Sequence, residues 1–154
     1  MGARMGARWT RWRAAALATL LLAACGENPT GPDPALGPLV GEWNAKSLVL
    51  TSVANPQVHP DLIALGAAFK LDVQPSGQYT AILVYAQQAS TEIGTITVSG
   101  NTMTLNRDFP TRSTSAAVFR ISGNTLTMDG DTEFDFNLDG TPEDALAHFE
   151  LERR

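Results

Sequence analysis

The sequence predicts an all-β domain, closed as an antiparallel up-and-down β-barrel of about eight or nine strands. Apolar and polar residues alternate with a period of two along most of the chain after residue 38. The tetrapeptide Ser-Gly-Asn-Thr occurs at 99–102 and again at 122–125, each time between two alternating stretches, as in tight hairpins. Helix patterns are scarce. Closure removes the exposed sheet edges that a row of sequential hairpins otherwise leaves.

Each strand is expected from its own alternation. Phe69, Leu71 and Val73 alternate with polar residues, and a Pro-Ser-Gly turn at 75–77 ends that strand. The stretch 78–87 carries apolar residues on both faces, so its pattern leaves open which face points inward. The expected strands cover residues 42–51, 69–74, 78–87, 91–98, 102–105, 117–121, 125–128 and 146–152.

The stretch 60–68, which reads PDLIALGAA, is the best helix candidate. Leu62, Ile63 and Leu65 fit a turn or two of helix, and they fit equally a loop that packs these side chains onto the barrel. The sequence leaves both interpretations open.

The N-terminus has the pattern of a secretory signal peptide: four arginines, an apolar run at 14–24 and small residues before Cys25. The apolar run is shorter than the roughly 20 residues that cross a bilayer. Leu-Ala-Ala-Cys at 22–25 resembles the lipobox of bacterial lipoproteins. The resemblance implies cleavage before Cys25, a diacylglycerol thioether on its sulfur and acylation of its amino group. The alternative is an ordinary signal whose cleavage leaves a cysteine nearby; the start codon is Met1 or Met5.

The chain is expected to divide into a lipoprotein signal peptide at 1–24, a Pro/Gly-rich tether at 25–38 and one barrel domain at 39–154. Cys25 is the only cysteine, so its acylation leaves no thiol for a disulfide or a metal. In such lipoproteins a residue other than aspartate after the cysteine, here Gly26, implies the periplasmic face of the outer membrane. We therefore expect a protein of the bacterial cell envelope, bound to its membrane through the lipid on Cys25.

The charge balance argues against nucleic acid as a partner. Without the signal peptide, seven basic residues face sixteen acidic ones, a formal net charge of −9, which repels phosphate backbones. His59 lies in an expected loop and His148 on a polar strand face, and neither has a nucleophile or metal ligand at a recognised spacing. We expect no enzymatic activity, no catalytic residue and no cofactor.

Three motifs resemble those of lipocalins and lipocalin-like calycins. Gly-Glu-Trp at 41–43 is similar to the Gly-x-Trp motif at the head of the first strand in that family. Ser-Gly-Gln-Tyr-Thr at 76–80 is similar to the family's Gly-x-Tyr turn and strand, and the hairpin at 94–105 resembles one of its hairpins. The resemblance covers nearly all of 39–154 and implies a lipocalin-like barrel.

The resemblance also assigns structural roles at one end of the barrel. It implies that Trp43 closes that end and that an arginine from the last strand region, Arg153 or Arg154, lies across the indole as a cation–π pair. Lipocalins proper usually continue into a helix after the last strand, whereas this sequence ends at Arg154. The chain thus looks like a compact bacterial lipocalin-like lipoprotein domain, for which the family name alone implies no ligand.

An eight-stranded barrel is just wide enough to be filled by side chains or to hold one small ligand. Aromatic, aliphatic and methionine side chains on alternating faces are the candidates to line a pocket for a small apolar molecule: Phe69, Leu71, Tyr79, Leu83, Tyr85, Phe119, Met128 and Phe149. The alternative is a packed barrel, in which they form the core and the loops and acidic rim contact envelope proteins. The bulk of these residues favours the packed barrel, and both functions stay open.

The acidic stretch 129–144 contains a partial calcium-loop pattern. Asp135, Asn137 and Asp139 alternate as oxygen ligands do in such loops, a glycine follows, and Glu143 falls at the ninth position. The twelfth position, where a bidentate glutamate is needed, is Leu146. We favour the alternative that a strand runs here into an Asp-Gly turn.

Overall fold

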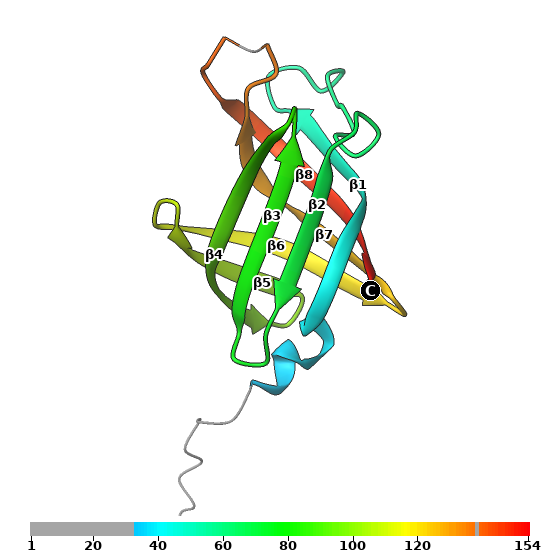
Figure 1. Ribbon diagram of the computed structural model, residues 1–154, viewed down its shortest axis with the longest axis vertical. Coiled ribbons are helices and arrows are strands. Elements are labelled where there is room, and N and C mark those ends of the chain that lie inside the picture. Colours follow the sequence, from blue (N-terminus) through cyan, green and yellow to red (C-terminus); the bar gives the residue numbers. More distant parts are fainter. Residues whose placement is uncertain (1–32, 138) are drawn as a thin grey trace, which may run out of the picture.

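The computed structural model describes residues 33–137 and 139–154, so Cys25 and its expected lipidation lie outside the described part. The chain forms a barrel in which each strand pairs antiparallel with the next and β8 closes against β1 (Figure 1). The strands are β1 (Gly41–Ser52), β2 (Ala68–Val73), β3 (Gln78–Tyr85), β4 (Gln88–Ser99), β5 (Thr102–Phe109), β6 (Ser113–Ser122), β7 (Thr125–Phe134) and β8 (Glu143–Arg153). This confirms the predicted all-β up-and-down barrel of lipocalin-like architecture and fixes its strand number at eight.

Both predicted Ser-Gly-Asn-Thr hairpins form with two-residue loops. Ser99 pairs with Thr102 between β4 and β5, and Ser122 pairs with Thr125 between β6 and β7. The first loop residue is a glycine with positive φ in each case, +62° and +58°, as a type II′ turn requires. The repeated turn therefore sets the register of two of the hairpins.

Most of the strands are longer than predicted, including β4 and β8, which begin at Gln88 and Glu143. β5 continues beyond Leu105 to Phe109, β6 begins at Ser113, and β7 continues to Phe134. These extensions are mostly polar and exposed, so they lack the apolar alternation on which the sequence prediction depended. The predicted strand 78–87 is in turn too long, because residues 86 and 87 form the two-residue turn to β4, both with positive φ.

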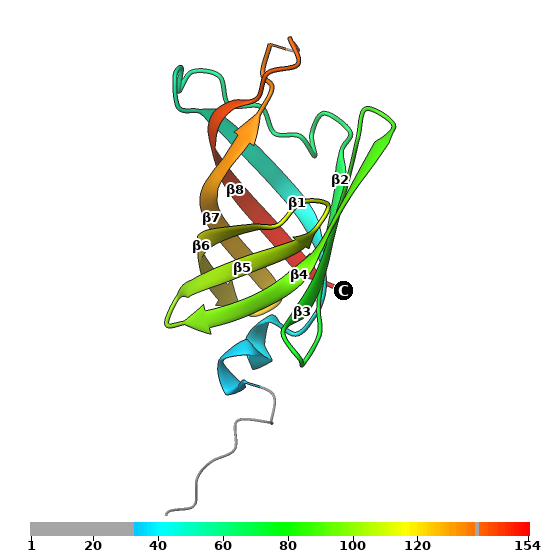
Figure 2. The same cartoon turned by 90° about the vertical axis from the view of Figure 1, so that its left-hand side faces the viewer.

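The lower end of the barrel in Figure 2 is closed by a short 3-10 helix, η1 (Pro34–Leu39). Leu36 and Leu39 of η1 are buried in the barrel core, and the indole Nε1 of the fully buried Trp43 donates to the Leu39 carbonyl at 2.8 Å. Residues 34–38, expected in the tether, therefore belong to the barrel domain. The prediction was wrong there because proline and glycine dominate the segment while its leucines supply the apolar surface.

Arg153 lies over the ring of Trp43, with its Cζ atom 4.2 Å from the ring centroid. The two residues face each other in the pairing of β1 with β8. The guanidinium also donates hydrogen bonds of 2.6 Å to the carbonyls of Val40 and Pro38. One arginine side chain thus joins the last strand to the first strand and to η1.

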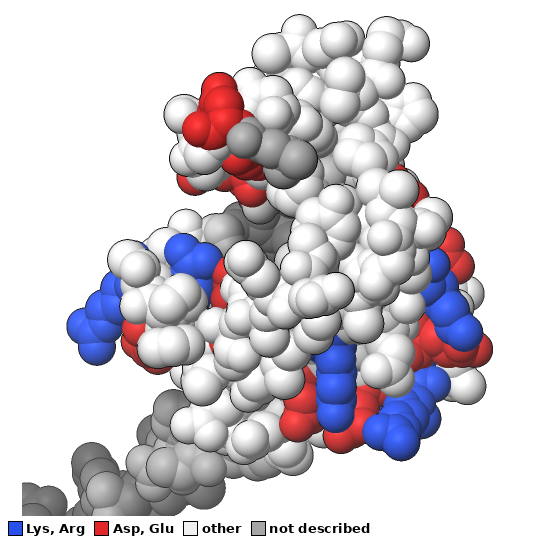
Figure 3. Space-filling model, turned by 45° about the horizontal axis from the view of Figure 1, so that its top comes forward, with Lys and Arg blue, Asp and Glu red and all other residues white. Residues whose placement is uncertain are grey.

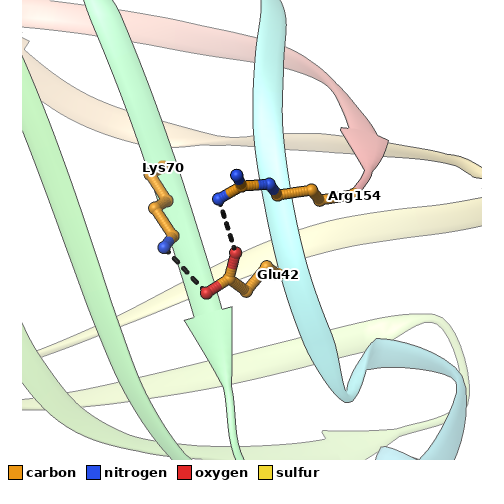
Figure 4. A network of polar contacts seen from close by, with 3 residues as sticks. All are labelled: Glu42, Lys70 and Arg154. Carbon is orange, nitrogen blue, oxygen red and sulfur yellow. Dashed lines mark hydrogen bonds and ion pairs between the residues drawn. The ribbon is translucent and has the colours of Figure 1, made fainter.

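Arg154 lies elsewhere, on the outer surface, where Glu42 stands between it and Lys70 (Figure 4). Lys70 Nζ is 2.9 Å from Glu42 Oε1, and Arg154 Nη1 is 3.4 Å from Glu42 Oε2. The hydrogen bond and charge of Lys70 lower the pKa of Glu42. Because these groups are exposed to water, the network adds little stability, and it connects β1, β2 and the chain end.

The closed half of the barrel is packed with side chains. Its buried cluster consists of Leu36, Leu39, Trp43, Leu71, Val73, Tyr79, Ala81, Ile96, Met103, Leu126, Met128 and Leu151. A second buried cluster lies toward the open end and consists of Leu48, Leu50, Leu62, Ala67 and Ala147. Side chains therefore fill the barrel interior at the closed end and fill it less completely at the open end.

The segment between β1 and β2 is a loop, so the helix interpretation of 60–68 is wrong. Leu62 is 1% exposed and packs onto the open end of the barrel, whereas Leu65 is 60% exposed and points away. An isolated bridge joins Asp61 to Val49 of β1 and fixes the loop beside the barrel. Among the described residues, no helix is long and apolar enough to span a membrane.

Candidate functional site

The open half of the barrel contains a solvent-accessible cavity of about 680 Å³. This volume lies within the range of about 300–1,000 Å³ that is usual for small-molecule sites. The cavity has two different walls. The contiguous strands β8, β1, β2 and β3 supply mainly apolar side chains, and β4 to β7 supply mainly small or polar ones.

The apolar wall consists of Leu48, Leu50, Leu62, Phe69, Leu71, Leu83, Ala147 and Phe149. The rings of Phe69 and Phe149 pack with centroids 4.9 Å apart. Most of the pocket candidates chosen from the sequence do line this cavity. Tyr85 and Phe119 do not: Tyr85 packs against Phe134, with ring centroids 6.4 Å apart, and Phe119 packs on the core of the closed half.

The structure also settles the orientation of β3. Tyr79, Ala81 and Leu83 point into the barrel, whereas Val84 is 41% exposed on the outside. The sequence alternation could not decide this because apolar residues occupy both faces of this strand.

Strands separate toward the open end, where the β5–β6 hairpin projects sideways from the barrel (Figure 1). Pairing of β6 with β7 stops at Ala117 and Gly130, although β6 begins at Ser113 and β7 runs on to Phe134. The inner positions near this separation are small, with Ser115, Ala117 and Gly130 lining the cavity. Small residues thus line the inner face near the open end, although bulky residues dominate the pocket candidates chosen from the sequence.

An ion pair lies on the polar wall. Arg107 Nη1 donates to Glu92 Oε1 at 2.7 Å, and Arg107 Nε donates to the Thr111 carbonyl at 2.9 Å. Both charged side chains line the cavity and are partly exposed, by 30% for arginine and 39% for glutamate. Sequence reasoning missed both residues. Arg107 lies beyond the predicted end of its strand, and Glu92 has the appearance of an ordinary polar-face residue.

Tyr79 lies beside this pair on the inner face. Its ring is buried, and its hydroxyl has no hydrogen-bond partner among the described residues. Burial, and then the charge of Glu92, raise the pKa of Tyr79 to about 12. The phenol is therefore a neutral group at neutral pH.

The loop that carries Leu62 is held over the cavity by Asp61. The carboxylate accepts hydrogen bonds from the Leu48 amide at 3.1 Å, the Ile63 amide at 2.9 Å and the Ser47 hydroxyl at 2.8 Å. Burial alone would raise the pKa of Asp61, but these hydrogen bonds outweigh it and lower that pKa below its usual value. The charged carboxylate therefore anchors the loop to β1.

The acidic loop between β7 and β8 forms the cluster of red side chains at the upper left of Figure 3. Asp135 accepts from the amides of Asp139 and Gly140 at 3.1 and 2.8 Å, and Asn137 Oδ1 accepts from the Asp139 amide at 2.9 Å. These oxygens are thus engaged by the backbone of an Asp-Gly turn. Within the described residues, no group of three or more histidine, cysteine or acidic side chains has a geometry that could hold a metal ion.

The two histidines are not part of the cavity wall. His148 lies on the outer face of β8, where its Nδ1 is 2.6 Å from Asp129 Oδ1, and both side chains are exposed. His59 lies exposed in the loop between β1 and β2. Glu92 and Arg107 thus form an ion pair in the cavity wall, and Asp131, Glu133 and Asp144 also line the cavity.

A scan against protein-family models and a search of the curated proteins found no match to this chain.

Proposed function

We propose that this chain is a lipid-anchored protein of the bacterial cell envelope whose barrel binds one small, largely apolar molecule. The observation that carries the proposal is the cavity of about 680 Å³ with one continuous apolar wall, in a barrel whose other half is packed. A packed barrel that acts only through its surface has no need of such a space.

The expected affinity is moderate. A ligand of about twenty heavy atoms that gains about 0.3 kcal/mol per atom binds with about 6 kcal/mol, which corresponds to a dissociation constant of tens of micromolar. Ser113 and Ser115 line the cavity and are exposed to solvent. A ligand can therefore enter the cavity beside them, where the strands separate.

The first experiment is native mass spectrometry of the chain from residue 26 onward, purified from the envelope extract of its own host. A co-purifying small molecule that leaves on mild activation supports a carrier and gives the mass of its ligand. A bare protein that shows no mass shift with fatty acids, quinones or haem contradicts the proposal. Cross-linking to envelope neighbours would then be the next step.

A cavity-filling variant tests the location of binding. Ser115→Trp places an indole into the cavity from a small, exposed inner position of β6, whereas Arg120→Trp places the same side chain on the outer face of that strand. We expect titration with the apolar dye N-phenyl-1-naphthylamine to show enhanced fluorescence with the wild type and with Arg120→Trp. Loss of the enhancement is expected for Ser115→Trp only, and equal binding by both variants would locate the dye outside the barrel.

The lipid anchor is tested separately. Replacement of Cys25 by serine removes the thiol that the lipobox chemistry needs, so incorporation of labelled palmitate and retention in the membrane fraction should both be lost. Retention of the Cys25→Ser protein in membranes would show that something other than this lipid anchors it.

A further inference from the structure

Tyr79, Glu92 and Arg107 form a polar cluster on three adjacent strands, β3, β4 and β5. Tyr79 and Arg107 both pair with Gly94, one from each side, so all three positions share the inner face of the barrel. Glu92 lies on that same face two residues before the glycine. Because Gly94 has no side chain, nothing from β4 separates the tyrosine from the arginine at this level.

The ion pair leaves hydrogen-bonding groups free toward the cavity. Arg107 uses Nη1 and Nε, and Glu92 uses Oε1, in the bonds already described. In the part of the chain that the structure describes, no hydrogen bond occupies Arg107 Nη2 or Glu92 Oε2. The cavity wall therefore presents a donor and an acceptor side by side.

The cluster carries no net charge. One arginine and one glutamate cancel, and the buried tyrosine, with its pKa raised to about 12, is neutral at neutral pH. An ionic head group would meet an opposite and a like charge together, and it would give up its hydration without a counter-ion of its own. Asp131, Glu133 and Asp144 also line the cavity, but they are exposed, so water and salt screen their charges.

We infer that the cavity selects a neutral amphiphile whose head group both accepts and donates hydrogen bonds, such as a primary amide. Its head group lies on Arg107 and Glu92, and its chain lies along the apolar wall formed by Leu50, Phe69 and Phe149. This inference depends on the proposed function, because it names the class of ligand for the same cavity.

The test compares three molecules with the same chain and different charge: octanamide, octanoate and octylamine. Residues 25–154 are used with Cys25→Ser, so that no acyl chain competes, and each molecule displaces N-phenyl-1-naphthylamine. For the wild type we expect octanamide to bind at least about tenfold more tightly than either ion, the ratio that one charge-assisted hydrogen bond typically makes.

Two variants should reverse the preference. Glu92→Gln leaves the charge of Arg107 uncompensated, so octanoate should gain about tenfold in affinity. Arg107→Gln leaves Glu92 uncompensated, so octylamine should gain by a similar factor. Glu152→Gln and Lys70→Gln make the same changes of net charge on the outer surface and should leave all three affinities unchanged.

The outcomes separate this inference from the proposed function. If the dye binds but the wild type prefers an ion, or if the outer variants act like the inner ones, the head-group inference is wrong and the proposed function stands. If neither the dye nor any of the three molecules binds, both fail. Circular dichroism of each variant shows whether it has kept its fold. If a variant is unfolded, the order of the three affinities measured with the wild type decides the inference.

Discussion

Replacement of Gly94 by alanine should destabilise the barrel strongly, because β5 passes directly over this residue. A Cβ atom built on Gly94 would lie 2.1 Å from the Asn106 carbonyl oxygen and 2.9 Å from Arg107 Cα. Ordinary contact begins at about 3.4 Å, so the β5 backbone would have to move by about 1.3 Å. A flexible side chain could rotate away from the new methyl group, but a paired strand cannot.

The expected loss follows from two effects. Overpacking of this kind costs about 1–3 kcal/mol, and each ladder hydrogen bond weakened beside Asn106 costs about 0.5–1.5 kcal/mol. Alanine recovers about 0.4–1 kcal/mol by restricting the unfolded chain. The free energy of unfolding should therefore fall by about 3 kcal/mol, a large part of the roughly 5–15 kcal/mol that a domain has in total.

Two other glycines serve as graded controls. At Gly130 the new Cβ would lie 3.1 Å from the Ala116 carbonyl oxygen, so small adjustments suffice and we expect a loss of about 1 kcal/mol. At Gly37 nothing lies within 4 Å, so the stability should stay within about 0.5 kcal/mol.

The assay is urea unfolding followed by tryptophan fluorescence. Trp43 is the only tryptophan after residue 24, and it is buried at the closed end, so its emission reports the folded barrel. The reasoning is refuted if Gly94→Ala loses less than about 1 kcal/mol, or no more than Gly130→Ala.

Three further predictions use the same assay. Arg153→Met removes the cation–π contact with Trp43 and two hydrogen bonds to carbonyls, so a loss of about 2–3 kcal/mol is expected; an unchanged midpoint would show that the stacking is incidental. Ala86→Asn combined with Gln87→Gly relieves two positive-φ positions at a two-residue hairpin loop, so the protein should gain about 1 kcal/mol; a loss would contradict the assigned turn. The lowered pKa of Asp61 means that its carboxylate stabilises the fold fully above the usual pKa of 3.8, and this contribution disappears as the pH falls through the lowered value. The wild type should therefore be more stable than Asp61→Asn at pH 7, with the difference shrinking at lower pH, and a constant difference would exclude the titration of this group as the cause.

The sequence pattern predicted most of the strands, because residues such as Phe69, Leu71 and Val73 alternate without interruption and the Gly-Asn turns mark where the chain reverses. It could not predict the positions where the alternation shifts. A bulge between Ala45 and Ser47 changes which face of β1 points inward.

A second irregularity lies next to the polar cluster, between β4 and β5. Between β4 and β5 the pairing shifts from Ile93 with Phe109 to Gly94 with Arg107, which leaves Asp108 as an extra residue. This extra residue comes after Arg107, which shares the inner face of β5 with Met103 and Leu105. Arg107 was missed because the apolar alternation stops at Leu105, so the predicted strand ended there.

The sequence by itself determined the fold class and the hairpin turns, since these depend on residues that are neighbours in the chain. Tertiary structure alone decided that the barrel is packed at one end and hollow at the other, because that depends on where β6 and β7 separate. It also decided that Tyr79, Glu92 and Arg107 share the inner face of three adjacent strands, since the register of these strands is set by pairing across the sheet. Distant residues are brought together by such pairing, and no local pattern in the chain records it.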